Sequence, residues 1–114
     1  MKKIFISQAM KGLTNEQIEF ERNKAIKKIK ELYGEVEIID SFFKINTVQI
    51  KPLEKPLWFL GRSIQLLSKA DLAVFVGDYQ NARGCAIEYK CAKEYGIETL
   101  VLQKENEHAN LEKD

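Results

Sequence analysis

Two short apolar runs constrain the fold of this chain most, because each is followed by a polar loop and then by a helical pattern. Residues 3–7 are mainly β-branched and aromatic, and residues 72–76 are entirely apolar. A strand that is apolar along its whole length is typical of a parallel sheet with both faces covered by helices. The repeated order of strand, loop and helix therefore predicts an α/β protein.

The remaining elements follow from hydrophobic period and from helix breakers. Thr14 and Gln17 fit a capping box that opens a helix, and Gly34 provides its left-handed stop. Two further strands are expected at residues 36–39 and 99–102, the latter buried, and two further helices at residues 57–68 and 84–95. The inward positions of the first two helices are expected to be Ile18, Ala25, Ile26, Ile29, Leu32 and Tyr33, and then Trp58, Leu60, Ile64 and Leu67.

Residues 42–56 show no regular period and contain both prolines of the chain. A segment of this length inside a compact domain is usually functional, and we expect a long loop or flap over a pocket. Residues 104–114 are strongly charged and are expected to form a tail.

This order of elements predicts one doubly wound domain over residues 1–103, of the flavodoxin or Rossmann-like kind. The sheet should have four parallel strands in the order 2-1-3-4, with helices on both faces. In such a sheet a ligand binds beyond the carboxyl ends of the strands, where the winding reverses between the first and third strands. The loops that begin at Ser7 and at Gly77 border that crevice.

Charge and composition exclude several classes of function. The 114 residues carry a formal net charge of +1, which attracts neither nucleic-acid polymers nor membrane surfaces. No apolar run approaches the roughly 20 residues that span a bilayer, and the apolar stretch at the start is too short for a signal peptide. Cys85 and Cys91 point to different faces of one helix, so we expect no disulfide. We therefore expect a cytoplasmic protein.

The loop and helix start at residues 77–88 are the most informative segment for chemistry. Free backbone N–H groups and the helix dipole make a helix N-terminus a site for phosphate or other oxyanions. Arg83 adds a cation of bidentate geometry, and Gly84 permits close approach of a ligand to the backbone. Loops of this kind occur in many α/β proteins, so the segment at residues 77–88 does not by itself identify a phosphate site.

Glu88 is the strongest catalytic candidate. It shares a helix stripe with Cys85, Tyr89, Ala92 and Tyr95, which should face the sheet. An exposed glutamate in a first turn would only complement the helix dipole. A glutamate on the packing stripe is costly unless it has a partner or a function, which favours a functional role.

The other candidates are substrate-binding residues near the crevice. Ser7 and Gln8 could bind a base or sugar, or could merely satisfy the strand end. Met10, in the loop that follows, and Cys85, in the first turn of the helix that carries Glu88, are further substrate-binding candidates. Asp78 could accept from a hydroxyl or simply stabilise a turn, and Asn81 lies in the same loop. Trp58 could stack on a base, although core packing is the simpler role.

No metal site or cofactor is expected. His108 is the only histidine and lies in the charged tail, which leaves no basis for a histidine-rich metal site or for activation of a nucleophile by histidine. The two cysteines lack the spacing of a zinc site.

These motifs together resemble a known family. The segments are KIFIS at residues 3–7, ADLAVF at 70–75 and RGCAIEY at 83–89, followed by Ala92 and residues 95–97. They resemble the nucleoside 2-deoxyribosyltransferase superfamily, in particular its small phage and bacterial branch, over about residues 2–102. The resemblance implies a doubly wound fold, oligomers that share active sites, and a nucleophilic glutamate that attacks the anomeric carbon of the sugar. Glu88 is the matching position.

The chain departs from the family pattern at two positions. Family enzymes commonly carry a tyrosine in the first strand, where this chain has Phe5. They also tend to have Asp or Ser two residues before the loop glycine, where this chain has Ala82. Asn81 and Arg83 could substitute for the missing polar contacts, and Arg83 suggests a phosphorylated ligand.

Two functions follow as expectations. The first is an enzyme that breaks or transfers the N-glycosidic bond of a nucleoside or nucleotide, with Glu88 as the nucleophile. The alternative is a protein that binds a nucleotide or nucleotide-derived signal without cleaving it. Because a four-stranded sheet gives a shallow pocket, we also expect a homodimer or a higher even-numbered oligomer in which residues 42–56 or 57–68 help to wall the site.

Overall fold

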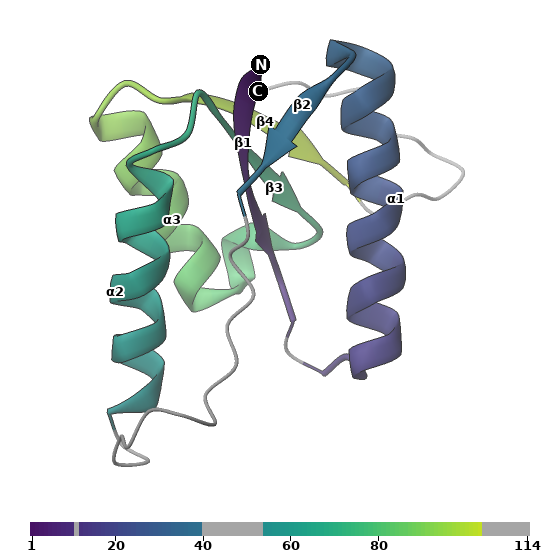
Figure 1. Cartoon of the computed structure of the whole chain (residues 1–114). Helices are drawn as coiled ribbons and strands as arrows, with labels where there is room; N and C mark the ends of the chain where they lie inside the picture. Colours follow the sequence, from purple (N-terminus) through teal and green to yellow (C-terminus); the bar gives the residue numbers. More distant parts are fainter. Residues whose placement is uncertain (11, 40–53, 104–114) are drawn as a thin grey trace.

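The computed structural model describes residues 1–10, 12–39 and 54–103. Strands and helices alternate along these residues (Figure 1). In chain order the elements are β1 (Lys2–Gln8), α1 (Asn15–Tyr33), β2 (Val36–Ile38), α2 (Lys55–Leu67), β3 (Leu72–Val76), the short 3-10 helix η1 (Tyr79–Asn81), α3 (Arg83–Glu94) and β4 (Glu98–Leu102).

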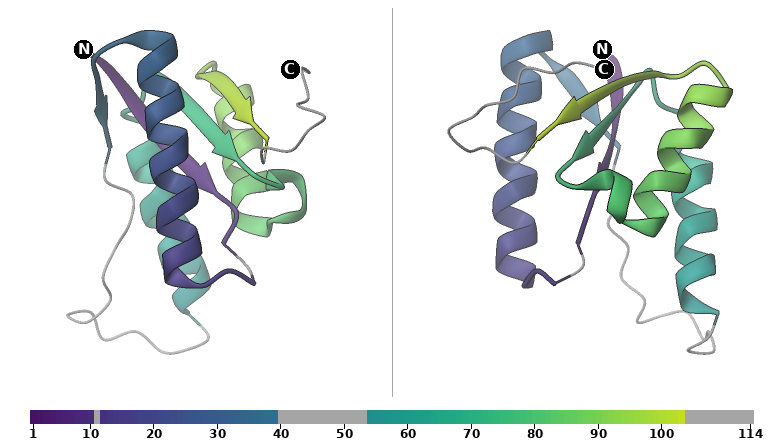
Figure 2. Two further views of the ribbon diagram at one scale, coloured as in Figure 1. Left: turned by 90° about the vertical axis from the view of Figure 1, so that its right-hand side faces the viewer. Right: turned by 180° about the vertical axis from the view of Figure 1, so that it is seen from behind.

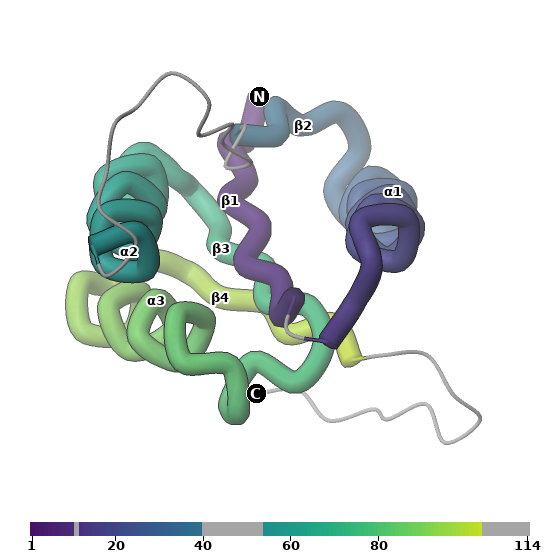
Figure 3. Tube along the Cα trace, turned by 90° about the horizontal axis from the view of Figure 1, so that it is seen from below, coloured from purple at the N-terminus to yellow at the C-terminus, as the bar shows by residue number. Residues whose placement is uncertain are grey.

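The four strands form one parallel sheet in the order β2-β1-β3-β4. Figures 2 and 3 show α1 on one face of the sheet and α2 and α3 side by side on the other. The expected fold class, strand order and two-sided cover are therefore confirmed. The order reverses between β1 and β3, so the carboxyl ends of these two strands border the crevice of a doubly wound fold.

The core has two layers because successive side chains of β1 point to opposite faces of the sheet. Ile4 and Ile6 face α1, whereas Phe5 faces α2 and α3. β3 contributes to both layers in the same way and is buried along its whole length, as the sequence predicts. The α1 layer contains Ile4, Ile6, Ala25, Ile29, Leu72, Val74 and Val76, and the other layer contains Phe5, Leu66, Leu67, Ala73, Phe75 and Ala92.

Helix α1 begins and ends where the sequence predicts. The Thr14 hydroxyl accepts from the Gln17 backbone N–H at 3.1 Å, and the Gln17 side chain accepts from the Thr14 N–H at 2.9 Å. Gly34 follows the helix with a φ of 78°, which only glycine adopts without strain. Leu32 and Tyr33, which the pattern placed inward, are exposed, and the Tyr33 ring instead lies 5.6 Å from the Lys2 ammonium.

Three further burial predictions are wrong. β4 is only half-buried, because it is an edge strand with a neighbouring strand, β3, on one side only. Tyr95 is 83% exposed, because α3 ends at Glu94 and the next residue no longer follows the helical stripe. Trp58 is exposed as well, since the buried residues of α2 are Leu66 and Leu67 near its other end.

Two expected segments fall outside the described residues, namely the charged tail at 104–114 and most of the flap at 42–56. The end of the expected flap is described, and there Pro56 belongs to the first turn of α2. In the described part of the chain no helix combines the length and the apolar character needed to cross a bilayer.

Candidate functional site

A cavity of about 560 Å³ lies at the carboxyl end of β1, between the loop that follows β1, the helix α2 and the start of α3. The sheet supplies its floor and the two helices its walls. Its lining comprises Phe5, Ile6, Ser7, Gln8, Ala9, Met10, Pro56, Phe59, Leu60, Ser63, Asn81, Ala82, Arg83, Gly84, Cys85 and Glu88. This is the position at which a doubly wound sheet binds its ligand.

Glu88 lies buried in this cavity and is held by Ser7. The Ser7 hydroxyl donates to Glu88 Oε1 at 2.5 Å, and both side chains are less than a tenth exposed. The contact arises because Ser7 shares the face of β1 with Phe5, and Glu88 lies on the face of α3 that packs on the sheet. A hydroxyl that donates to a carboxylate fixes its rotamer and stabilises its charge.

Burial and hydrogen bonding act on Glu88 in opposite directions. Burial is the larger effect and raises the pKa of its carboxyl above the usual glutamate value, while hydrogen bonds from Ser7 and Ser63 lower it. Burial also raises the pKa of the neighbouring Cys85 thiol, while a hydrogen bond with Ser7 lowers it and the charge of Glu88 raises it. The raised pKa disfavours the reactive thiolate form of Cys85.

The start of α3 opens into the same cavity. The residue before the helix is Ala82, which provides no side-chain cap for the first N–H groups of the helix. Arg83 and Gly84 form the first turn and both line the cavity. Unpaired backbone N–H groups, the helix dipole and a guanidinium at one place form an arrangement that binds oxyanions.

An aromatic cluster holds the loop that leads into α3. The Tyr79 ring of η1 lies 4.8 Å from the Tyr89 ring of α3, and Tyr89 in turn lies 5.1 Å from Phe75 of β3. These contacts anchor the loop to the sheet on one side and to the helix on the other. The position of the helix start is thus set by packing and not by a capping side chain.

The structure brings together eight of the ten residues that the sequence analysis named as candidates, and Trp58 does not line the cavity. Glu88, Ser7, Gln8, Met10, Asn81, Arg83, Gly84 and Cys85 all line the cavity. Asp78 does not. Its carboxylate accepts from the Asn81 side-chain amide at 2.8 Å, and it lines a smaller pocket that shares Gln8 and Ala9 with the first cavity. The backbone turns just before Asp78, at Gly77, where φ is 84°.

Sequence reasoning expected the helix at residues 57–68 to help wall the site within an oligomer, but it did not identify the residues of α2 that line the cavity of one chain. Phe59, Leu60 and Ser63 line the cavity, together with Pro56 at the start of the helix. The spacing of Phe59 and Ser63 by four residues would place both on one helix face, but no motif marks that face as the one toward the cavity. For Ser7 a signal did exist, because strand alternation puts it on the same side as Phe5 and Glu88.

The chemistry of the lining is that of an organic ligand site. Polar groups gather around Glu88 and at the start of α3, while Phe5, Phe59 and Leu60 form apolar walls. Among the described residues, no group of three or more His, Cys, Asp or Glu side chains could hold a metal ion.

Comparison of the sequence with protein-family models and with curated proteins finds no match.

Proposed function

We propose that this protein cleaves or transfers the N-glycosidic bond of a nucleoside or nucleotide, with Glu88 as the nucleophile. The observation that carries the proposal is the buried Glu88 carboxylate, held by the Ser7 hydroxyl at 2.5 Å in a cavity of about 560 Å³. A carboxylate fixed in this way beside a ligand-sized space has the position and orientation of a nucleophile.

The proposed reaction has two steps. Glu88 attacks the anomeric carbon of the sugar through an oxocarbenium-like transition state, and the bond from that carbon to the base nitrogen breaks. The bonding electron pair leaves with the base, which takes up a proton. Water or the nitrogen of a second base then attacks the same carbon, loses a proton to the solvent, and releases Glu88 as a carboxylate. Water yields hydrolysis and a base yields transfer.

The surrounding residues have distinct roles in this scheme. Ser7 orients the nucleophile through its hydrogen bond. Arg83 and the N–H groups at the start of α3 bind a phosphate on the sugar, which positions the anomeric carbon over Glu88. The aromatic walls formed by Phe5 and Phe59 face the base. Asn81 and Met10 complete the lining of the cavity.

A second candidate function is binding of a nucleotide without cleavage. It is favoured by the apolar character of Phe5 and Ala82 in the cavity, at positions where a catalyst would use polar groups. Ligand-dependent thermal stabilisation in which the nucleotide is recovered unchanged would support this function.

We also propose a cytoplasmic homodimer or a higher even-numbered oligomer. Leu57 and Trp58, in the first turns of α2, are exposed beside cavity residues Pro56 and Phe59, and Ile87 on α3 is exposed as well. Burying such side chains against a second copy of the chain would remove apolar surface from water. It would also cover the open side of the site. Light scattering after size exclusion tests this, since a monomer of 13.2 kDa would contradict it.

The decisive experiment for the activity is a substrate panel. The protein is incubated with each deoxynucleoside and 5′-deoxynucleotide, with and without a free acceptor base, and released base is measured by chromatography. We expect turnover of at least one substrate, and its loss in Glu88→Gln, which keeps the size and a hydrogen-bond acceptor for Ser7. The exposed Glu94→Gln on the same helix is the matched control. Absence of Glu88-dependent turnover across the panel would overturn the proposal.

A further inference from the structure

The helices α2 and α3 pack against each other along the cavity that contains Glu88, and both run in the same direction because they connect parallel strands. Leu60 of α2 lies at the start of α3, where its Cδ1 atom is 4.0 Å from the position that a Cβ on Gly84 would occupy. Ser63 follows Leu60 by three residues, and Glu88 follows Gly84 by four. Side chains at these spacings lie on one face of a helix. The register of the two helices therefore places Ser63 beside Glu88, and both side chains line the same cavity.

Ser63 gives Glu88 a second hydrogen-bond donor. The Ser7 hydroxyl of β1 donates to Glu88 Oε1. The Ser63 hydroxyl also forms a side-chain hydrogen bond with this carboxyl, and both bonds lower its pKa against the larger effect of burial. An ionised carboxyl has about four lone-pair sites, so it accepts from both hydroxyls at once. Glu88 is therefore held from two elements of the fold, the strand β1 and the helix α2.

Few groups near Glu88 can affect its charge. Among the described residues that line the cavity, the only other charged or titratable side chains are those of Arg83 and Cys85, and both belong to α3. The described residues of β1, of α2 and of the loops contribute no charged or titratable group to this lining. Helix α2 contributes a single polar side chain, the half-buried Ser63, among apolar ones. A substitution at Ser63 therefore removes a neutral donor and leaves the charges around Glu88 as they are.

We propose that Ser63 is a positioning residue for Glu88 and that, together with Ser7, it holds the side chain as a charged carboxylate in one orientation. This inference rests on the proposed function, in which the carboxylate attacks the anomeric carbon of the sugar. A hydroxyl stabilises a charged acceptor more than a neutral one, so each donor favours the form that acts as a nucleophile. Rotation of the carboxylate would break at least one of the two bonds. The pair of donors therefore also keeps the attacking oxygen in place.

The experiment is a pH titration of ¹³C-labelled protein, in which the NMR signal of the Glu88 carboxyl carbon is followed without any substrate. Ser63→Ala removes one donor, and we expect the acid to become about fivefold weaker, since a hydrogen bond to a charged group is stronger than one to a neutral group. Its titration should thus move to higher pH. Ser63→Thr keeps the hydroxyl and should restore the titration of the wild type. An unchanged Glu88 titration in Ser63→Ala would overturn the proposal, whether or not the protein is an enzyme.

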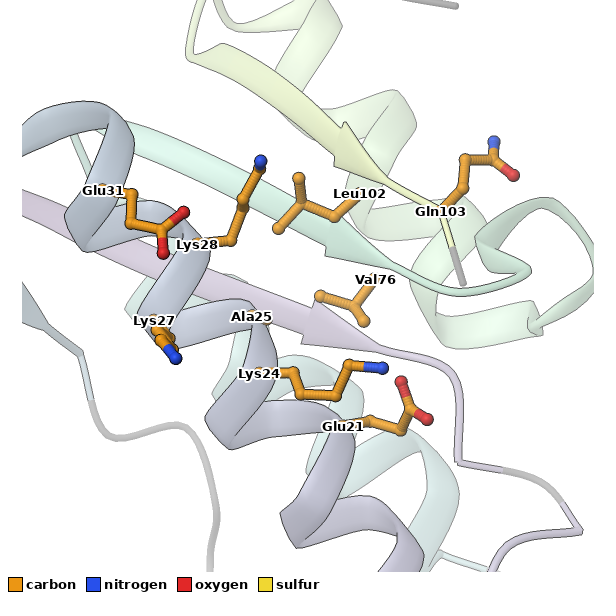
Figure 4. Close-up of a pocket in the computed structure, with 9 residues that line it drawn as sticks. All are labelled: Glu21, Lys24, Ala25, Lys27, Lys28, Glu31, Val76, Leu102 and Gln103. Carbon is orange, nitrogen blue, oxygen red and sulfur yellow. The ribbon is translucent and has the colours of Figure 1, made fainter. Parts of the chain in front are cut away.

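Matched controls separate this effect from a general change in α2 or in the solution. Ser68→Ala removes a serine hydroxyl at the end of the same helix, where it donates to the Gln65 carbonyl at 2.6 Å, and should leave the Glu88 titration unchanged. Glu21 and Glu31 line a separate cavity of about 430 Å³ beside α1, on the other face of the sheet (Figure 4). Their carboxyl signals should respond to pH identically in all these proteins. A change in Glu88 that Ser68→Ala reproduces would contradict a specific role of Ser63.

Kinetics then separates the failure of this inference from the failure of the proposed function. With a substrate found in the panel, the acidic limb of the pH profile of kcat/KM should move to higher pH in Ser63→Ala by the same fivefold factor, and Ser63→Thr should reverse this. Turnover that depends on Glu88 but keeps its acidic limb in Ser63→Ala would refute the role of Ser63 alone. A shifted NMR titration without turnover of any substrate would overturn the proposed function alone, and Ser63 would then position the carboxyl for ligand binding.

Discussion

Replacement of Ser7 by alanine tests the pairing on which the site depends. The change removes one hydroxyl and leaves a small side chain in a position that is 3% exposed, so the packing of Phe5 and β3 is preserved. What is lost is the bond to Glu88 Oε1 at 2.5 Å. The loss of stability caused by Ser7→Ala should therefore depend on whether Glu88 is charged.

The magnitude follows from the kind of acceptor. A hydrogen bond to a charged group contributes about 1.5–3 kcal/mol to stability, and one between neutral groups about 0.5–1.5 kcal/mol. Ser7→Ala should thus lower the free energy of unfolding by about 2 kcal/mol when Glu88 is ionised and by about 1 kcal/mol when it is protonated.

The pH dependence has a definite sign. Burial raises the pKa of Glu88 in the folded state above that in the unfolded chain, so the folded state holds this proton more tightly. Stability from this group is greatest at low pH and falls as pH rises from the usual glutamate pKa through the raised one. Removing Ser7 raises the folded-state pKa of Glu88 further, so this loss of stability extends to higher pH.

Urea denaturation of the wild type and of Ser7→Ala, each from pH 4 to pH 8, measures the effect. The difference between the two proteins should grow with pH by about 1 kcal/mol. In the Glu88→Gln background the same substitution should cost about 1 kcal/mol at every pH. A pH-independent difference that is equal in both backgrounds would refute the pairing.

Three further predictions concern the fold and the anion site. Thr14→Ala should lower stability by about 1 kcal/mol, because it removes the hydroxyl of the capping box, and urea denaturation measures this. Ile29→Ala should cost about 3 kcal/mol by the same assay, because Ile29 is fully buried. Leu32→Ala on the same helix should cost less than about 1 kcal/mol, because Leu32 is exposed, and equal losses would contradict the burial of α1. Arg83→Ala should weaken binding of a 5′-nucleotide at least about tenfold in calorimetric titrations and leave the nucleoside unaffected. Equal loss for both ligands would show that Arg83 does not contact the phosphate.

Much of the fold could be predicted from the sequence, because its signals are local. The apolar runs in β1 and β3, the capping box at Thr14 and the glycine at position 34 each specify one element or its end. The rules of parallel sheets then determine the strand order. The exposure of Trp58 and Tyr95 was not predictable in this way, because it depends on where each helix ends and on which part of it lies over the sheet.

The grouping of the candidate residues around one cavity was predictable to a similar extent. Crossover topology brings the ends of β1 and the start of α3 together, which places Ser7, Arg83 and Glu88 at one cavity. The position of Asp78 depends on the turn at Gly77, and the contribution of Ser63 depends on the rotation of α2 about its axis. Neither is fixed by spacing along the chain, because both result from tertiary packing.

Trapping of a covalent intermediate between Glu88 and the sugar tests the proposed activity most directly. A 2-deoxy-2-fluoroarabinosyl nucleoside or 5′-nucleotide carries a fluorine that destabilises the oxocarbenium-like transition state, so the glycosyl-enzyme should accumulate. We expect intact mass spectrometry to show one added fluorosugar per chain, peptide mapping to place it on Glu88, and Glu88→Gln to show none. Base release from natural substrates without any adduct on Glu88, or an adduct on another residue, would contradict the account.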